Sequence, residues 1–179
     1  LRTFHIVDHV DPGQVTVLQR FCQHKTRIVG IDVDLQAFLA AFRCHIGALL
    51  QGHPCIHIPG VDMSSGSLGQ GISAACGMAL AGKLDSAPYH VYAILGDGEI
   101  GEGQVWEAAM FAGHYKLSNL CWLIDYNGLQ IDGPIDEVVG PAPYPEKFTA
   151  FGWNVVECDA HDFDSIEAAY KAARACDDK

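Results

Sequence analysis

The chain has 179 residues, a formal net charge of −11 at pH 7, and a composition that is 49% hydrophobic. The negative charge argues against a nucleic-acid partner and against docking on an anionic membrane surface, and no apolar run is long enough to span a bilayer. The seven cysteines lack paired C-x-x-C spacing, so we expect free thiols rather than a disulfide framework. Residues 1–27 carry histidines and charges where a secretory signal needs an apolar core, so we expect a cytoplasmic protein.

The first half of the chain is predicted to alternate between strand, helix and loop. A strand is expected over 3–7, and a helix over 32–50, where apolar residues follow the i, i+3, i+4, i+7 rule. Residues 59–71 are rich in Gly and Ser and form a predicted loop that runs into a helix over 72–83. Glycine-rich loops at helix starts bind anions through backbone N–H groups, although the same composition is also that of an ordinary linker.

The central part of the chain is predicted to be a strand, a loop, a helix and a second strand. Residues 89–95 form an apolar strand, 104–117 a helix that is apolar on most faces and therefore predicted to be buried, and 120–125 a second apolar strand. The two strands should lie parallel as neighbours, with their carboxyl ends at one edge of the sheet.

The last part of the chain is predicted to complete the same sheet. Residues 134–145 contain four prolines and are predicted to be an ordered surface loop without helix or strand. A strand is expected over 153–158, and the capping-box spacing of Asp164-Ser165-Ile166-Glu167 predicts a last helix. We therefore predict a single domain over 1–179 with a three-layer α/β/α fold and a mainly parallel sheet.

Polar residues follow both central strands at the predicted edge. Asp97 comes directly after the first strand and Asn127 follows the second. A carboxylate, an amide oxygen and a backbone carbonyl near Leu129 are hard oxygen ligands suited to magnesium or calcium. Beside a helix amino terminus, such a site would hold a diphosphate through the metal and the backbone N–H groups together.

The loop after the first central strand has two other interpretations. Gly96, Gly98 and Gly101 also fit the G-x-G-x-x-G motif of nicotinamide dinucleotide binding, with Asp125 as the ribose-binding acid. Against this, the loop carries three acidic side chains, which disfavour a pyrophosphate unless a cation intervenes. A purely structural role as turn residues is the alternative for the aspartate and the asparagine taken singly.

The two segments resemble those of a known family. Gly-Asp-Gly followed by an asparagine at the next strand end resembles the thiamine-diphosphate motif. The flanks Glu102-Gly103-x-x-Trp106-Glu107-Ala108-Ala109 and Asn127-Gly128-Leu129-Gln130-Ile131-Asp132-Gly133 are similar to those of transketolases. The resemblance implies thiamine diphosphate with Mg²⁺ or Ca²⁺ as cofactors, and transfer of a ketol unit from a ketose phosphate to an aldose phosphate.

The resemblance also implies roles for individual residues. The metal would be held by Asp97, Asn127 and the Leu129 carbonyl, and the cofactor would be contacted by Gly66, Ser67, Leu68, Gly96, Asp97, Gly98 and Asn127. Gly52-His53-Pro54 resembles the family's Gly-His-Pro motif, so His53 would meet the substrate, and Glu102 would belong to a carboxylate network across a dimer interface. By composition alone, zinc is an alternative for His45, His53, Cys55 and His57, but their spacing fits no common finger.

The chain departs from the family at both ends. Residues 1–30 lack the family's early histidine motifs, and the final strand of the module is not found before Lys179. No arginine-rich loop that could bind a substrate phosphate is present either. The missing arginines indicate that a substrate-phosphate site is supplied by another chain or domain. The resemblance implies a partner, either a pyrimidine-binding module or a C-terminal subunit, in a homodimer or heterotetramer that acts on sugar phosphates of the pentose phosphate pathway.

Two other functions stay open at this point. One is a different thiamine-diphosphate enzyme component, such as a synthase or a dehydrogenase E1-like subunit, which would share the metal motif but should lack the two flanks. The other is a non-catalytic fragment or interaction subunit, which the missing histidines and the missing final strand suggest.

Overall fold

A six-stranded sheet forms the centre of the structure, a computed structural model that describes residues 2–7, 27–31, 55–57, 61–140 and 142–176. The strand order is β3-β2-β4-β5-β1-β8, and each of these pairings is parallel. The strands are β1 (Arg2–Val7), β2 (Arg27–Ile31), β3 (Val61–Met63), β4 (Val91–Gly96), β5 (Leu120–Tyr126) and β8 (Asn154–Asp159). The predicted mainly parallel sheet is therefore confirmed, including the strands predicted over 3–7, 89–95, 120–125 and 153–158.

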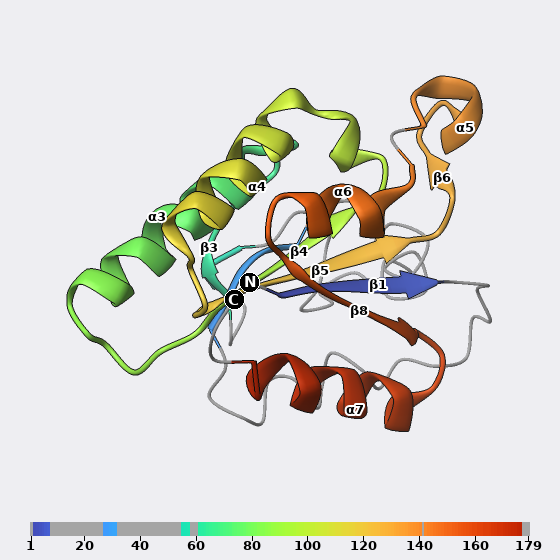
Figure 1. Ribbon diagram of the computed structural model, residues 1–179. Helices are drawn as coiled ribbons and strands as arrows, with labels where there is room; N and C mark the ends of the chain where they lie inside the picture. Colours follow the sequence, from blue (N-terminus) through green and yellow to red (C-terminus); the bar gives the residue numbers. More distant parts are fainter. Residues whose placement is uncertain (1, 8–26, 32–54, 58–60, 141, 177–179) are drawn as a thin grey trace.

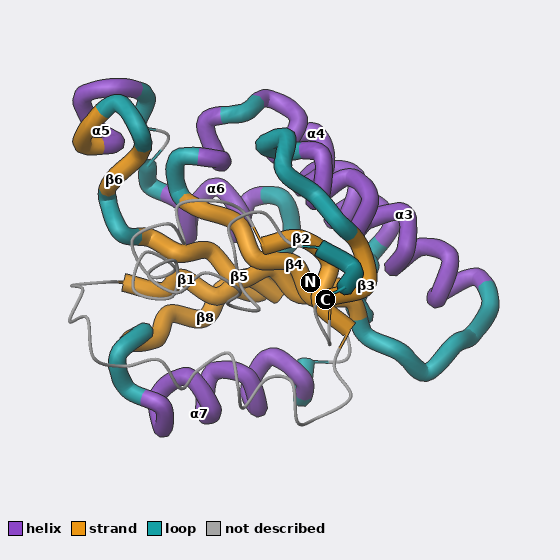
Figure 2. The backbone as a smooth tube through the Cα atoms, turned by 180° about the vertical axis from the view of Figure 1, so that it is seen from behind, coloured by secondary structure: helices purple, strands orange, loops and turns teal. Residues whose placement is uncertain are grey.

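Helices cover both faces of the sheet, as Figures 1 and 2 show from opposite sides. On one face lie α3 (Gln70–Leu84), α4 (Gly103–Tyr115) and α6 (Tyr144–Ala150), and on the other lies α7 (Phe163–Arg174). This arrangement confirms the three-layer α/β/α fold. Among the described residues, no helix is both long enough and apolar enough to cross a membrane.

The alternation of side chains along the central strands explains the two layers of core. Trp122 and Ile124 of β5 point to the face that α3, α4 and α6 cover, and join a large buried cluster there. Cys121 and Leu123, on the opposite face, pack in a smaller cluster with Ala169 of α7. Because both faces are buried, the strands are apolar throughout rather than alternating, as is typical of parallel sheets.

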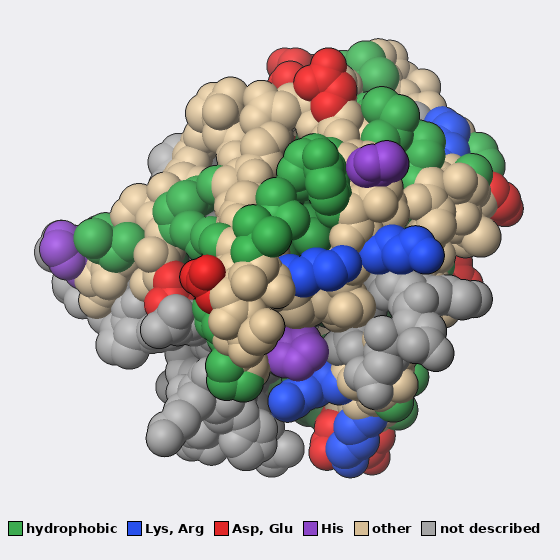
Figure 3. Space-filling view, turned by 60° about the vertical axis from the view of Figure 1, so that its left-hand side comes forward, with side chains coloured by type: hydrophobic (Ala, Val, Ile, Leu, Met, Phe, Trp, Pro, Cys, Tyr) green, Lys and Arg blue, Asp and Glu red, His purple; other side chains and the backbone are tan. Residues whose placement is uncertain are grey.

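The prediction that the central helix is buried is wrong for its outer side. Val105, Ala108, Ala109 and Ala112 of α4 are buried, but Met110, Phe111 and Tyr115 are exposed. Figure 3 looks at this side of the molecule and shows hydrophobic side chains gathered beside Lys and His side chains. Small residues form the inner stripe of α4, which lets the helix approach α3 and the sheet closely.

The prediction that residues 134–145 lack regular structure is also wrong. The hairpin strands β6 (Leu129–Gln130) and β7 (Gly133–Pro134) pair antiparallel, and the short helix α5 (Ile135–Val138) follows. The helix α6 then begins at Tyr144, with Pro145 in its first turn. A proline in the first turn removes an N–H group that has no intrahelical partner, so it does not disturb the helix.

The start of the last helix differs from the predicted capping box. The N-cap is Asp162, whose Oδ1 accepts a hydrogen bond from the Asp164 N–H at 3.0 Å. The Ser165 hydroxyl instead accepts from the Asp159 N–H at 3.1 Å, at the end of β8. Asp162 rather than Asp164 caps the helix, because its side chain reaches a free N–H group of the first turn from just outside the helix.

Several predictions fall on segments outside the described residues. These include the helix over 32–50 and the histidine His53.

Two strands, β2 and β3, were not predicted. β3 has three residues within a segment rich in Gly and Ser, which gives no pattern of alternating hydrophobicity to recognise.

Candidate functional site

The buried carboxylate of Asp97 lies at the carboxyl edge of the sheet, where β4 ends. Its side chain is 0% exposed, although a charged side chain is almost never fully buried without partners. Oδ1 accepts a hydrogen bond from the Gly98 N–H at 2.9 Å, and Oδ2 accepts one from the Gly128 N–H at 2.7 Å. The Asp97 N–H donates in turn to the Asp125 carbonyl of β5 at 3.0 Å. The ends of β4 and β5 are thus joined through one aspartate, as the parallel arrangement predicted.

Asn127 and Leu129 continue the site directly after β5. The Asn127 Oδ1 accepts a hydrogen bond from the Leu129 N–H at 2.8 Å, and its Nδ2 donates to Asp125 Oδ2 at 3.2 Å. Leu129 pairs with Pro134 in the hairpin, and proline has no N–H group to donate to the Leu129 carbonyl. The Leu129 N–H bond to Asn127 thus links the two residues whose oxygens were predicted to bind the metal.

The donor set of these three residues fits a hard divalent cation. It consists of a carboxylate, an amide oxygen and a backbone carbonyl, which are the ligands that Mg²⁺ and Ca²⁺ prefer. The hydrogen bonds described above use only part of the acceptor capacity, because each of these oxygens has two lone pairs. Within the described ranges, there is no group of three or more His, Cys, Asp or Glu side chains that could hold a metal.

The glycine-rich loop at the start of α3 lies beside the Asp97 loop. Gly69 is the N-cap of α3, and its left-handed φ of 80° is a conformation that favours glycine. Its N–H donates to Oε1 of Glu99 at 2.8 Å. Ser67 and Leu68 are exposed and Gly66 is half-buried. The predicted cofactor-contacting loop and the predicted metal loop are therefore brought together at the amino end of a helix.

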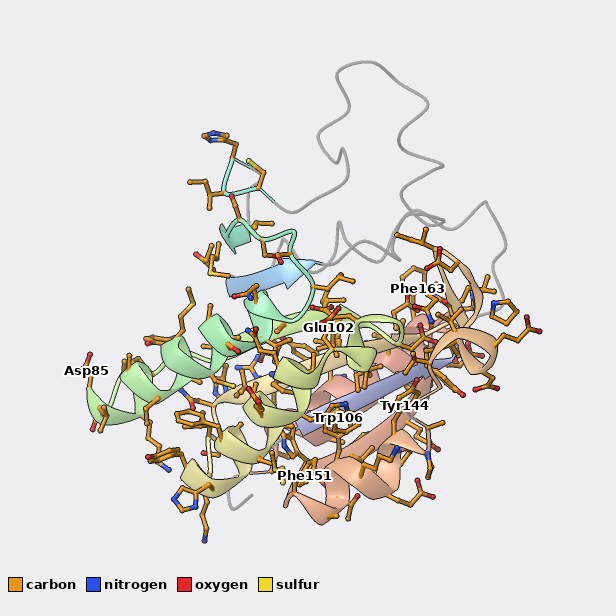
Figure 4. All side chains as sticks on the ribbon, turned by 90° about the horizontal axis from the view of Figure 1, so that it is seen from above. Asp85, Glu102, Trp106, Tyr144, Phe151 and Phe163 are labelled. Atoms are coloured by element: carbon orange, nitrogen blue, oxygen red, sulfur yellow. The ribbon has the colours of Figure 1, made fainter. Side chains whose placement is uncertain are left out.

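Glu102 lies at the start of α4 and is exposed (Figure 4). It is the N-cap residue of that helix, but its side chain makes no capping hydrogen bond. Its predicted place in a carboxylate network across a dimer interface stays a prediction. The same holds for the predicted role of His53, which is not among the described residues.

Sequence reasoning missed two side chains that line the site from within. Glu99, in the 3₁₀ turn η3 (Glu99–Gly101), is only 5% exposed, and Tyr144 is buried against Tyr126 at a ring-centroid distance of 5.1 Å. Burial raises the pKa of the Tyr144 hydroxyl, and the nearby Asp97 raises it further. The acidic residues of the loop were visible in the sequence, but which of them turns inward depends on η3, and no pattern in the sequence pointed to the tyrosine.

Comparison with known proteins gives one consistent result. The chain matches the family described as "Transketolase, thiamine diphosphate binding domain" over residues 11–179. It is 44% identical over 126 residues to an apulose-4-phosphate transketolase subunit of Phocaeicola vulgatus, a match that covers 70% of this chain and 45% of that protein. It is 50% identical over 120 residues to a 6-deoxy-6-sulfo-D-fructose transketolase subunit of Clostridium sp. strain MSTE9, covering 67% of this chain and 44% of that protein.

Solved structures give the same answer. A transketolase from Campylobacter jejuni superimposes with a TM-score of 0.69 at 27% identity, covering 92% of this chain and 28% of that one. A Pichia stipitis transketolase, crystallised with xylulose 5-phosphate, gives a TM-score of 0.71 at 30% identity over 86% of this chain and 27% of that one. The chain thus spans less than half the length of these curated relatives and under a third of these solved chains.

Proposed function

Because the chain belongs to the transketolase family, matched over its thiamine diphosphate binding domain, we propose that it provides the diphosphate- and metal-binding half of a transketolase. Such an enzyme transfers a ketol unit from a ketose phosphate to an aldose phosphate, with thiamine diphosphate as the reactive group. The proposal adds to the family membership a metal, a substrate class and a partner.

The observation that carries the proposal is the buried carboxylate between two strand ends. Asp97 is held by N–H groups from its own loop and from Gly128, in the segment that contains Asn127 and the Leu129 carbonyl. Ligands in open parallel α/β sheets bind outside the carboxyl ends of the strands, which is where these oxygens lie. A carboxylate there would repel a diphosphate, and a divalent cation between them turns the repulsion into attraction.

In this proposal each residue has a separate task. Asp97, Asn127 and the Leu129 carbonyl hold Mg²⁺ or Ca²⁺, while the backbone at Gly66, Ser67, Leu68, Gly96 and Gly98 meets the cofactor. The N–H groups at the amino end of α3 have no partners within the helix and favour an anion. When bound, thiamine diphosphate supplies the electron sink for breaking and forming the carbon–carbon bond beside a carbonyl.

The proposed partners follow from the names of the relatives and from the charge of the chain. Two relatives are named as transketolase subunits, which supports a separate partner subunit that carries the pyrimidine-binding module. The net charge of −11 supports the same division, because basic side chains for sugar phosphates are then supplied elsewhere in a homodimer or heterotetramer. A place in the pentose phosphate pathway and in the cytoplasm belongs to the proposal as well.

Titration of the purified chain with thiamine diphosphate by calorimetry tests the proposal. We expect binding in the presence of Mg²⁺ and no binding in a chelator, since the cofactor's negative charge needs the cation beside Asp97. Replacing this aspartate with alanine should weaken the affinity by roughly a hundred-fold, because a metal ligand is lost.

A matched control is available on the same sheet face. Asp85 is an exposed aspartate at the far end of α3 from the site, as Figure 4 shows, and Asp85→Ala should bind like the parent chain. Equal binding with and without metal, or an unchanged affinity in Asp97→Ala, would contradict the proposed site.

A further inference from the structure

The backbone N–H and the backbone carbonyl of Gly69 are both hydrogen-bonded to side chains from a different part of the chain. The Gly69 N–H donates to Glu99 Oε1 at 2.8 Å, and the Gly69 carbonyl accepts a hydrogen bond from Gln104 Nε2 at 3.0 Å. We call Glu99, Gln104 and the Gly69 backbone the Gly69 clamp. It joins the start of α3 to the turn η3 and to the first turn of α4.

The second side chain of the clamp is itself fixed by neighbours. Gln104 Nε2 also donates to the Ser73 hydroxyl at 2.9 Å, and Gln104 Oε1 accepts from Gln70 Nε2 at 3.0 Å. All these contacts lie within the first turns of the two helices. The amide of Gln104 therefore connects α3 to α4 at three points besides its own backbone.

The chemistry of the clamp is unusual for a contact that only packs two helices. Glu99 is almost fully buried, and burying a carboxyl group is unfavourable unless hydrogen bonds compensate. An apolar residue would fill the same space without that cost. Gly69 adopts a left-handed conformation and offers no side chain for packing, so the polar contact acts on the backbone of the loop alone.

The position of the clamp suggests what it does. Glu99 lies two residues beyond Asp97 in the metal loop, and Gly69 directly follows the loop of Gly66, Ser67 and Leu68. One side chain thus sets the distance between the loop proposed to bind the metal and the loop proposed to contact the cofactor. We propose that Glu99 is a positioning residue that keeps these two loops in the arrangement that binds the metal–diphosphate unit, an inference that rests on the proposed function.

Three substitutions separate hydrogen bonding from charge. Glu99→Gln keeps the length and an acceptor oxygen, Glu99→Asp keeps the charge but is one methylene too short, and Glu99→Ala removes both. We expect Glu99→Gln to bind thiamine diphosphate with Mg²⁺ nearly as the parent chain does. The other two should bind roughly ten-fold more weakly or worse, the size expected for a lost hydrogen bond to a charged group.

A second measurement needs no cofactor. In the chain alone, the amide hydrogens of Gly69 and Gln70 should exchange faster in Glu99→Ala and Glu99→Asp, and at the parent rate in Glu99→Gln. Gln104→Ala, which releases the carbonyl side of the clamp, should also speed exchange there. The control is Tyr89→Phe, which removes a 2.9 Å hydrogen bond from the Tyr89 hydroxyl to the Met78 carbonyl of the same helix, and it should leave both exchange and affinity unchanged.

The outcomes distinguish the clamp from the proposed function. Unchanged exchange in Glu99→Ala overturns the clamp, whatever the cofactor does. Faster exchange in Glu99→Ala with an unchanged affinity for the cofactor overturns the positioning role. A Glu99→Gln variant that binds the cofactor as poorly as Glu99→Ala also overturns it, because the charge of Glu99 rather than its hydrogen bond would then determine the affinity. A parent chain that exchanges as expected but binds no cofactor overturns the proposed function while the clamp itself stands.

Discussion

Cys76 shows how a single buried thiol takes part in the contact between two helices. It lies on α3 and donates a hydrogen bond from its Sγ to the Ala108 carbonyl of α4 at 3.6 Å. Burial raises the pKa of this thiol from its ordinary value of 9.0 to about 12. The thiol is therefore neutral in the folded chain at physiological pH, and it behaves as a small apolar residue with one weak donor.

This raised pKa predicts a loss of stability at alkaline pH. Between the ordinary pKa of 9.0 and the raised value of about 12, the unfolded chain has lost the Cys76 proton while the folded chain keeps it. The free energy of unfolding should fall there by up to about 1.4 kcal/mol per pH unit from this one group. Urea unfolding at about pH 8 and about pH 10.5 should show a smaller fall in Cys76→Ala than in the parent chain.

The packing effect of the Cys76→Ala substitution is the same at both pH values, so it cancels when the free energies of unfolding of one variant at the two pH values are subtracted. Cys158, whose pKa burial raises to about 11, contributes to the fall in both chains and so does not affect the difference. Parallel falls in the two chains would contradict the assignment to Cys76.

At the scale of single residues, the sequence pointed to the candidate ligands but not to the buried side chains beside them. Asp97 and Asn127 could be selected as candidates because each follows an apolar strand and lies next to a glycine. Glu99 and Tyr144 were not, because an inward-facing 3₁₀ turn and a helix from a distant proline-rich segment bring them to the site. Their burial depends on contacts between elements, which no local pattern contains.

At the scale of elements, the close approach of α4 to the chain just after α6 requires a glycine. A methyl group on Gly113 would stand well under 3.0 Å from the Phe151 carbonyl oxygen, a backbone atom that cannot move aside on its own. Gly77, in the interior of α3, has nothing within 4 Å of the same position and is exposed. The two helical glycines therefore form a matched pair that differs in tertiary contact.

Alanine at these two positions should change stability in opposite directions. Gly77→Ala should raise the free energy of unfolding by about 0.5–1 kcal/mol, because alanine favours the helix. Gly113→Ala should lower it by about 1–3 kcal/mol, since overpacking forces the two helices apart. Denaturant unfolding of both variants checks this, and a stabilised Gly113→Ala would show that the Phe151 carbonyl does not lie against Gly113.

The accuracy of the predicted elements follows their length and their composition. The helix predicted over 72–83 and the long apolar strands were confirmed because burial leaves a clear pattern over many residues. The hairpin of β6 and β7 has two residues in each strand, and Pro134 lies in it, so it gave no such pattern. Proline-rich composition predicted a loop where α5 and α6 begin, although prolines are tolerated there because helix starts need no N–H donor.

At the scale of the whole molecule, the proposed function predicts that this chain catalyses no ketol transfer by itself. The site proposed above supplies ligands for a metal and a diphosphate, and the relatives named as transketolase subunits support a separate partner that supplies the rest of the active site. The family's cofactor needs a second module for its pyrimidine end. Transfer from xylulose 5-phosphate to ribose 5-phosphate should therefore be negligible for the purified chain with saturating cofactor and Mg²⁺.

Activity should appear when a pyrimidine-binding partner chain is added in a coupled assay. The matching control is the same partner with Asp97→Ala, which should remain inactive because this variant lacks a proposed metal ligand. Turnover by the single chain on the order of one per second or more would show that no second module is needed.

The division of the core into two layers also determines what optical probes report. All three tryptophans, Trp106, Trp122 and Trp153, lie on the α3, α4 and α6 side of the sheet, where Trp122 and Trp153 are 4.4 Å apart by ring centroid. On the α7 side, the described residues include a stacked pair, Tyr92 and Tyr170, whose ring centroids are 5.2 Å apart. Intrinsic tryptophan fluorescence thus monitors only the layer formed by α3, α4 and α6. If α7 detached from the sheet, the tryptophan emission should stay largely unaltered, while the near-ultraviolet circular dichroism of the tyrosines should change.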